Sequence, residues 1–114
     1  MQPIVWPNLT GLNPDDPALQ WQPFRDGVEI LPIYNATSSE CACALLRYHP
    51  NASVPEHEHT GMEHLLILCG SQQDEHGIYP AGTLLINPTD THHAVSSPQG
   101  CVVLAIWEKP VRFL

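Results

Sequence analysis

Twelve prolines and seven glycines are spread along these 114 residues, and they limit the possible folds more than any other feature of the chain. Proline lacks a backbone N–H and clashes with the preceding helical turn, so a chain interrupted this often cannot form long helices. No segment keeps a helical period of apolar residues over several turns. The sequence therefore predicts an all-β fold.

Short apolar or alternating segments follow one another from Val28 onward, as strands of a sandwich or barrel do. Turn-forming residues separate them, notably at 70–77, 79–82 and 97–100, and these short connections favour a meander. A jelly-roll barrel would also leave a central cavity that can hold a small-molecule ligand. The expected strands are 28–34, 41–48, 64–69, 83–87, 93–96 and 101–107, with 111–114 as a last strand or a clasp across a dimer partner.

Residues 1–27 differ from the rest in being rich in Pro, Asn and Asp, with Trp6 and Trp21 as apolar anchors. We expect an extended N-terminal arm that packs on the barrel or crosses to a second subunit of a homodimer. The length fits one domain, so residues 28–114 would form a single barrel.

The composition limits the partners. A charged fraction of 14% beside 43% hydrophobic residues is typical of a folded chain. Twelve acids against four bases give a net charge of -8, so few phosphates could be neutralised, and we expect neither nucleic acid nor membrane as a partner. Four cysteines without a CxxC pair, and a start without a signal peptide, predict a reducing, cytoplasmic setting.

A candidate metal site stands out in the middle of the chain. His57 and His59 alternate, so they share one face if the segment is extended. Glu63 follows across a Thr-Gly turn, and His93 would arrive from a later strand. Three imidazoles and a carboxylate suit one divalent ion such as zinc, iron, nickel or manganese, and the donor types do not choose among these.

Two other histidines compete for this site. His92 and His93 are neighbours, so only one of them can point into a barrel from the same strand. His64 adjoins Glu63 and by strand parity should face the opposite way. Candidates for the cavity wall near the ligands are Tyr34, Arg47, Tyr48, Met62 and Trp107, for which ordinary core or dimer contacts are an equal alternative.

The same residues resemble the cupin family. Its first motif, G-x5-H-x-H-x3,4-E-x6-G, is matched by His57, His59, Glu63 and Gly70, without the leading Gly. The second, G-x5-P-x-G-x2-H-x3-N, is matched by Gly82, Pro88 and His93, with Asp90 at the middle Gly and Ser97 at the Asn. More narrowly, the segments 74–83, 87–88 and 97–101 are similar to the ChrR-like cupins, and the likeness runs from about residue 27 to 107.

The resemblance implies a cupin, or RmlC-like, jelly-roll barrel with a metal held by His57, His59, Glu63 and His93. His93 rather than His92 keeps the family's spacing from Pro88. In the anti-sigma factor that gives these cupins their name, the matching residues bind zinc. That protein also carries an H-x3-C-x2-C domain that grips the sigma factor; residues 1–27 do not resemble it, so we do not expect a sigma factor as partner.

Two functions from different classes follow. Relatives of this cupin type include carbon–carbon cleaving dioxygenases, which implies oxygen chemistry on a small keto or phenolic compound. The alternative is a metal-dependent sensory or regulatory module without turnover. A closed set of four protein ligands favours the second function and an open coordination position the first.

Overall fold

Strands dominate the structure, a computed structural model that describes residues 2–35 and 41–114, and the all-β prediction is confirmed. A 3-10 turn, η1 (Leu9–Gly11), precedes ten strands. These are β1 (Gln22–Arg25), β2 (Val28–Asn35), β3 (Ala42–Tyr48), β4 (Ala52–His59), β5 (Glu63–Asp74), β6 (Gly77–Pro80), β7 (Leu84–Asn87), β8 (His92–Ser97), β9 (Cys101–Trp107) and β10 (Val111–Phe113). Among the described residues, no helix has the length and apolar character needed to cross a membrane.

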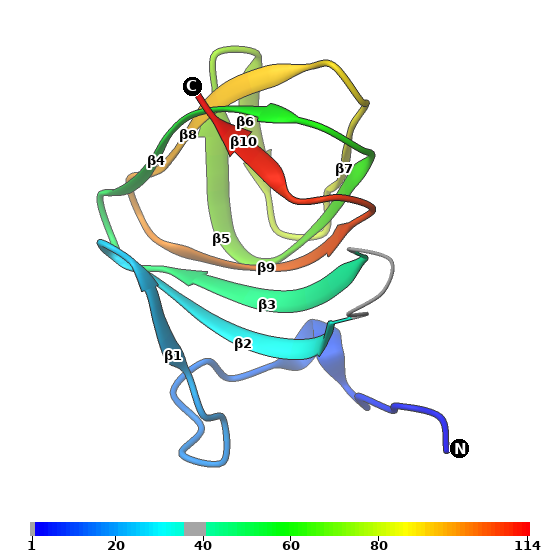
Figure 1. The fold of residues 1–114 in the computed structure, drawn as a ribbon. Coiled ribbons are helices and arrows are strands. Elements are labelled where there is room, and N and C mark those ends of the chain that lie inside the picture. The colour runs from blue at the N-terminus through cyan, green and yellow to red at the C-terminus, as the bar shows by residue number, and fades with distance from the viewer. Residues whose placement is uncertain (1, 36–40) are drawn as a thin grey trace.

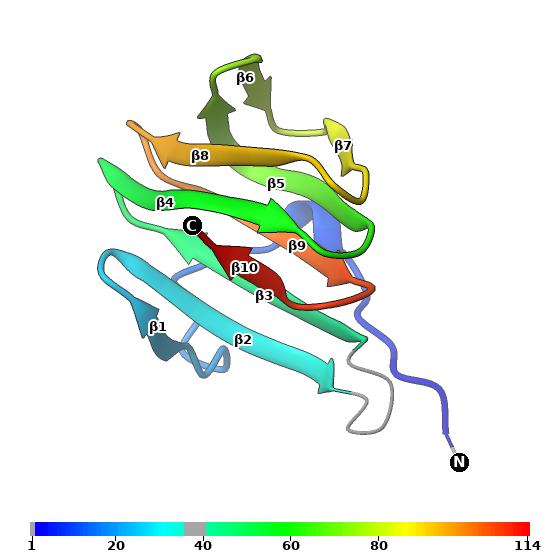
Figure 2. The ribbon, with the colours of Figure 1, turned by 45° about the horizontal axis from the view of Figure 1, so that its top comes forward.

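The strand order is that of a jelly roll, and the expected meander is wrong. The order is β1-β2-β3-β9-β5-β8-β4-β10, with β6 and β7 paired to β5, so β3 lies beside β9 and β4 beside β8. Consecutive strands such as β3 and β4 therefore belong to opposite walls. Figures 1 and 2 show the sheet curling so that β4, β8 and β10 lie across from β2 and β3, with β5 running through both walls.

The expected turn at 70–77 is also wrong over most of its length, because β5 continues to Asp74 and turns only at 75–76. Gly70 has a φ of 71°, and a Cβ built on it would lie 2.1 Å from the carbonyl oxygen of Gly100. Glycine is thus needed here because two strands approach closely, next to a register shift between Ile67 and Cys69.

Two groups of apolar side chains hold the barrel together. The inner cluster fills the space between the walls and comprises Val28, Leu46, Tyr48, Ala52, Val54, Leu65, Ile67, Val95, Cys101, Val103 and Ala105. The outer cluster lies on the other face of the sheet and is centred on Leu45, Leu68 and Val102. Because the sheet is buried on both faces, its strands carry consecutive apolar residues as well as alternating ones.

Part of the N-terminal segment covers the outer cluster. Four of its apolar side chains pack against this cluster: Trp6, Leu9, Leu12 and Trp21. Figure 1 shows the segment, in blue, running past β2 on the side away from the barrel interior. Residues 22–25 instead extend the sheet as β1, which pairs antiparallel with β2. The boundary after residue 27 and the crossing to a dimer partner stay predictions.

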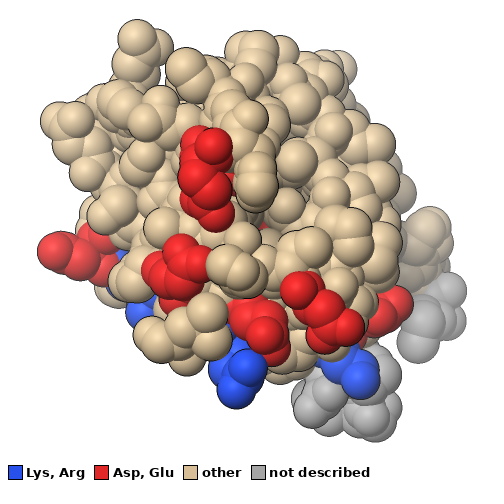
Figure 3. All heavy atoms as spheres, turned by 90° about the horizontal axis from the view of Figure 1, so that it is seen from above, with Lys and Arg blue, Asp and Glu red and all other residues tan. Residues whose placement is uncertain are grey.

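The surface is acidic. The face in Figure 3 carries several separate acidic side chains and few basic ones. Of the four basic residues, Arg47 pairs with Asp15 at 2.5 Å, Arg112 with Glu58 at 2.9 Å, and Arg25 stacks 4.0 Å from the ring centroid of Phe113. With these contacts, the chain offers little positive charge to a polyanion. That nucleic acid is not a partner stays a prediction.

Candidate metal centre

A bulge in β4 decides which way His57 and His59 point. Val54 pairs with Val95 and His57 with His93, so two residues of β4, 55 and 56, oppose the single residue 94 of β8. The buried positions of β4 accordingly change from even numbers, 52 and 54, to odd numbers, 57 and 59. An extra residue in one strand reverses the facing of everything after it. Both histidines thereby enter the barrel.

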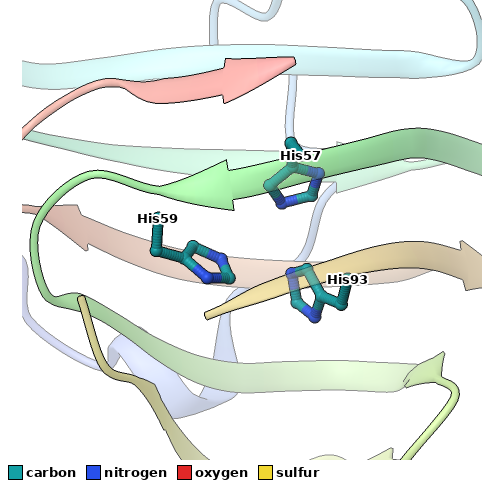
Figure 4. A group of neighbouring side chains, drawn as sticks. All are labelled: His57, His59 and His93. Atoms are coloured by element: carbon teal, nitrogen blue, oxygen red, sulfur yellow. The ribbon is translucent and has the colours of Figure 1, made fainter. Parts of the chain in front are cut away.

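The three imidazoles meet at one end of the interior. His57 and His93 are directly opposite in the β4–β8 ladder, and Figure 4 shows the rings of His57, His59 and His93 turned toward one another. Their centroids lie 5.3, 4.7 and 4.7 Å apart, and one nitrogen from each ring lies within 4.8 Å of the others. The side chains are 5%, 1% and 2% exposed, so solvent hardly reaches them.

Hydrogen bonds fix which nitrogen of each ring is available. The Nδ1 of His57 lies 2.8 Å from the carbonyl of Pro55, that of His59 lies 3.1 Å from the carbonyl of Thr91, and that of His93 lies 2.9 Å from a carboxylate oxygen of Asp74. These oxygens only accept, so each Nδ1 carries the hydrogen and each Nε2 keeps its lone pair. This is the arrangement expected of histidines that bind a metal through Nε2.

Two of these Nε2 atoms lack any hydrogen-bond partner. The Nε2 atoms of His59 and His93 are fully buried and unpaired. A buried polar atom without a partner costs roughly 1–3 kcal/mol, so proteins seldom keep two side by side without a ligand. Nitrogens bound to one ion at about 2.1 Å would lie about 3 to 4 Å apart, and one nitrogen from each of these rings already lies within 4.8 Å of the others. The three histidines therefore fit a divalent transition metal.

Glu63 borders this group but is not one of its mutually close members. Its Oε1 lies 3.2 Å from the Nε2 of His59, outside hydrogen-bond geometry, and accepts from the side-chain amide of Asn87 at 2.9 Å. Its Oε2 accepts from the indole N–H of Trp107 at 2.7 Å. The carboxylate is thus held in place beside the imidazoles, and its role as fourth ligand stays a prediction.

Burial and neighbours set the charge of these groups. Burial raises the pKa of Glu63, but the His59 imidazole and the donors of Asn87 and Trp107 outweigh it, so its pKa lies below the ordinary value. Burial lowers the pKa of His57, and the bond to the Pro55 carbonyl only partly offsets that effect. A charged carboxylate beside a neutral imidazole is the combination that a cation requires.

The competing histidines lie outside the group. His92 has a side chain 62% exposed and contacts Glu56, while His93, one residue on, faces inward. His64 is half-buried on the opposite face of β5 from Glu63 and lies beside Ile86 and Ile106 in the sheet. Strand parity accounts for both placements.

A small cavity adjoins the imidazoles. It encloses about 50 Å³ and is bordered by His57, Glu63 and His93. The remaining wall is mostly apolar and aromatic and consists of Phe24, Leu46, Tyr48, Val54, Leu65, Gln72, Val95, Trp107, Val111 and Phe113. Of the wall residues expected from the sequence, Tyr48 and Trp107 border it, whereas Tyr34, Arg47 and Met62 do not. Arg47 borders a separate outer cavity beside Pro14.

Sequence reasoning missed the residues behind the ligands. Asp74, Asn87 and Thr91 each contact one member of the site. Asp74 and Asn87 lie in the segments that resemble the ChrR-like cupins, but no pattern in the sequence assigned any of the three a role at the metal site. Asp90 occupies the position of the middle Gly in the family's second motif. Its φ is 71°, a left-handed conformation that Asp tolerates better than most residues other than glycine. Its N–H donates to the carbonyl of His59, which ties the loop to the site.

Comparison with known proteins shows which family this sequence resembles. The family model described as "ChrR Cupin-like domain" matches residues 14–111. The anti-sigma-E factor ChrR of Cereibacter sphaeroides is 32% identical over an alignment of 99 residues that covers 83% of this chain and 45% of that protein. The chain thus spans about half the length of this curated relative.

Solved structures agree on the fold. The crystal structure of Rhodobacter sphaeroides SigE in complex with the anti-sigma ChrR matches with a TM-score of 0.72 at 27% identity, over 87% of this chain and 54% of that one. An acetylacetone dioxygenase from Acinetobacter johnsonii matches with a TM-score of 0.77 at 15% identity, over 82% and 71%. From the matched residues and this fold, the chain belongs to the ChrR cupin-like family.

Proposed function

We propose that this chain holds one divalent metal ion on His57, His59 and His93, with Glu63 as fourth ligand. The observation that carries the proposal is the set of three inward-facing Nε2 atoms, each left with a free lone pair by the hydrogen bond at its Nδ1. Imidazole and carboxylate donors suit zinc, iron, nickel or manganese.

We further propose that the chain is a dioxygenase acting on a small keto or phenolic compound. The cavity beside the imidazoles supports this through its mostly apolar and aromatic wall, which favours an uncharged molecule over a charged one. A redox-active ion bound there would supply Lewis acidity and electrons for oxygen chemistry. The protein's part is to orient the three rings, to hold Glu63 through Asn87 and Trp107, and to exclude water with the aromatic wall.

Metal content tests the first proposal. Protein purified without added metal should contain close to one transition-metal ion per chain by elemental analysis. His93→Gln should lose it, while His92→Gln, at the exposed neighbouring position, should retain it. Protein that stays metal-free after incubation with zinc, iron, nickel and manganese would show that the three imidazoles are not a binding site.

Oxygen uptake tests the second proposal. Iron-loaded protein should consume oxygen with small diketones or hydroxyaryl ketones, and zinc-loaded protein should not. His92→Gln should match wild type, and His93→Gln should be inactive. If iron-loaded protein binds one ion per chain yet turns over none of these compounds, the dioxygenase proposal fails and metal binding stands.

The alternative is a sensory module without turnover; the 32% identity to an anti-sigma factor covers 45% of that protein and does not by itself favour this alternative. Coordination number separates the two functions, because closed sites are structural and open sites catalytic. X-ray absorption of the loaded protein should show a water or other exchangeable ligand if the dioxygenase proposal holds. Four protein donors and no exchangeable ligand would support the sensor.

A homodimer and a cytoplasmic location also remain proposals. Large apolar side chains on the N-terminal segment, Ile4 and Val5, are 62% and 71% exposed, and a second subunit would cover them. Sedimentation at micromolar concentration should give twice the mass of 12.6 kDa. A monomer would contradict the proposed dimer.

A further inference from the structure

One of the three imidazoles donates its Nδ1 hydrogen to a charged partner. The Nδ1 of His93 donates to the Oδ2 of Asp74 at 2.9 Å, and both side chains are 3% exposed. His57 and His59 instead donate to neutral oxygens of Pro55 and Thr91. Because a charge-assisted hydrogen bond is about twice as strong as a neutral one, His93 is the most firmly held of the three rings.

The carboxylate of Asp74 is itself fixed by the β5–β6 hairpin. Its Oδ1 accepts from the hydroxyl of Tyr79 at 3.0 Å and from the backbone N–H of His76 at 2.8 Å. Because both donors hold Oδ1, the other oxygen, Oδ2, is left to accept from His93, and the β5–β6 hairpin sets the direction of the carboxylate.

The register shift in β5 brings Asp74 to this place. Before the shift, the inward residues of β5 have odd numbers, 63, 65 and 67; after it, Gln72 is buried at 2% exposure and Asp74 shares its face. The shift between Ile67 and Cys69 thus turns Asp74 inward, just as the β4 bulge turns His57 and His59 inward. Two separate irregularities therefore bring residues to the same site.

We propose that Asp74 is a positioning residue for the metal centre. It holds His93 with the hydrogen on Nδ1, aims Nε2 at the other two imidazoles and strengthens that nitrogen as a donor. Through Tyr79, the metal affinity is coupled to the formation of the β5–β6 hairpin. The inference rests on the proposed metal site, but its effect on the tautomer of His93 exists without any ion.

Asp74→Asn tests the proposal with little change in shape. Competition with a chromophoric chelator should show cobalt(II) binding weakened by about 10- to 100-fold, the usual loss when such a partner is removed. Glu75→Gln is the matched control, since it removes the same charge at the neighbouring exposed residue and should leave the affinity unchanged. Equal affinity in Asp74→Asn and wild type would overturn the proposal.

Tyr79→Phe offers a second variant if Asp74→Asn folds poorly. It removes only the hydroxyl that steadies Oδ1. Cobalt affinity should fall by a few-fold, between the wild-type and Asp74→Asn values. A Tyr79→Phe protein that binds cobalt like wild type would refute the coupling to the hairpin.

Nitrogen NMR of the metal-free protein separates this inference from the proposed function. In wild type, His93 should carry its hydrogen on Nδ1, and in Asp74→Asn the Nε2–H form should become appreciable. If wild type binds no metal but shows this tautomer change, the metal proposal fails and the positioning role stands. If wild type binds metal while His93 carries its hydrogen on Nε2 in the metal-free protein, the role of Asp74 is refuted.

Discussion

The outer cluster and the ligand end of the interior are buried alike but differ in what they leave unpaired. Leu45, Leu68 and Val102 of the outer cluster are at most 8% exposed and have no polar side-chain atom to satisfy. The ligand end of the interior is buried as deeply, yet it keeps unpaired nitrogens on His59 and His93. One region stabilises the fold, whereas the other gives up stability to hold donors ready for a ligand.

The largest expected effect is that of His57→Leu, which should weaken metal binding strongly and leave the stability of the metal-free protein almost unchanged. We expect metal affinity to fall about a hundredfold or more, because one of four ligands supplies roughly a quarter of the about 10 to 16 kcal/mol that a structural zinc contributes. The stability of the metal-free protein should change by less than about 1 kcal/mol, since only a bond to Pro55, an exposed residue, is lost. Calorimetric titration and urea unfolding measure the two quantities.

His64→Leu is the matched control for this change, because His64 faces away from Glu63. Its metal affinity should equal that of wild type. A large loss of metal affinity in His64→Leu would contradict the placement of His64 on the face away from the site. A large loss of stability in metal-free His57→Leu would mean that the histidines stabilise the fold rather than serve metal binding.

Leu45→Ala should give the opposite pattern. Leu45 is fully buried in the outer cluster, so its truncation should lower the free energy of unfolding by about 2–5 kcal/mol through lost burial and a residual cavity. Metal affinity at a temperature where the variant is folded should be unchanged. Leu104→Ala, a partly buried neighbour in the same cluster, should cost less. A Leu45→Ala protein that folds normally but binds metal weakly would erase the distinction between the outer cluster and the ligand end.

The local part of this architecture could be predicted from sequence, and the non-local part could not. Alternation places His57 and His59 on one face whatever the partner strand, so the pair was predictable. Which face is inward depends on the bulge opposite residue 94, which exists only in the β4–β8 pairing. For the same reason β4 itself was not expected as a full strand.

Gly70 shows the same limit. A positive φ serves a turn and a close strand crossing equally well, and only the position of Gly100 distinguishes them. Taking Gly70 as the start of a turn put Asp74 in a loop, where its contact with His93 could not be foreseen. Residues behind the ligands are recognisable only after the register is known.

The inner and outer clusters should also differ in the reactivity of their cysteine thiols, which has a smaller effect on the protein than the changes above. Burial raises the pKa of Cys101, in the inner cluster, to about 11, despite an opposing bond from Ser97. At pH 8 its thiolate fraction should be roughly two hundredfold below that of a free thiol with a pKa of about 8.5. Iodoacetamide should therefore modify the partly buried Cys69 before the buried Cys101, as mass spectrometry can show.

The pH dependence gives the check on this prediction. Alkylation of Cys101 should accelerate about tenfold per pH unit up to pH 11, because only the thiolate reacts. Alkylation of Cys101 at pH 8 as fast as that of Cys69 would mean that the inner cluster opens readily to solvent.

The smallest expected effect concerns Glu63, at the border between the ligand end and the core. Its oxygens already accept from Asn87 and Trp107, so we expect it to act as a weaker ligand than the imidazoles. Glu63→Gln should lower metal affinity about tenfold, or roughly 1.4 kcal/mol. The cobalt(II) absorption spectrum should shift as the carboxylate ligand is lost.

Trp107→Phe supplies the control, because it releases Oε2 from the indole N–H while keeping the carboxylate. If Glu63 is a ligand, freeing this oxygen should leave the affinity unchanged or raise it slightly, whereas Glu63→Gln lowers it. If both variants lose affinity equally and neither alters the cobalt spectrum, Glu63 belongs with the groups that shape the interior, and the metal set is the three imidazoles alone.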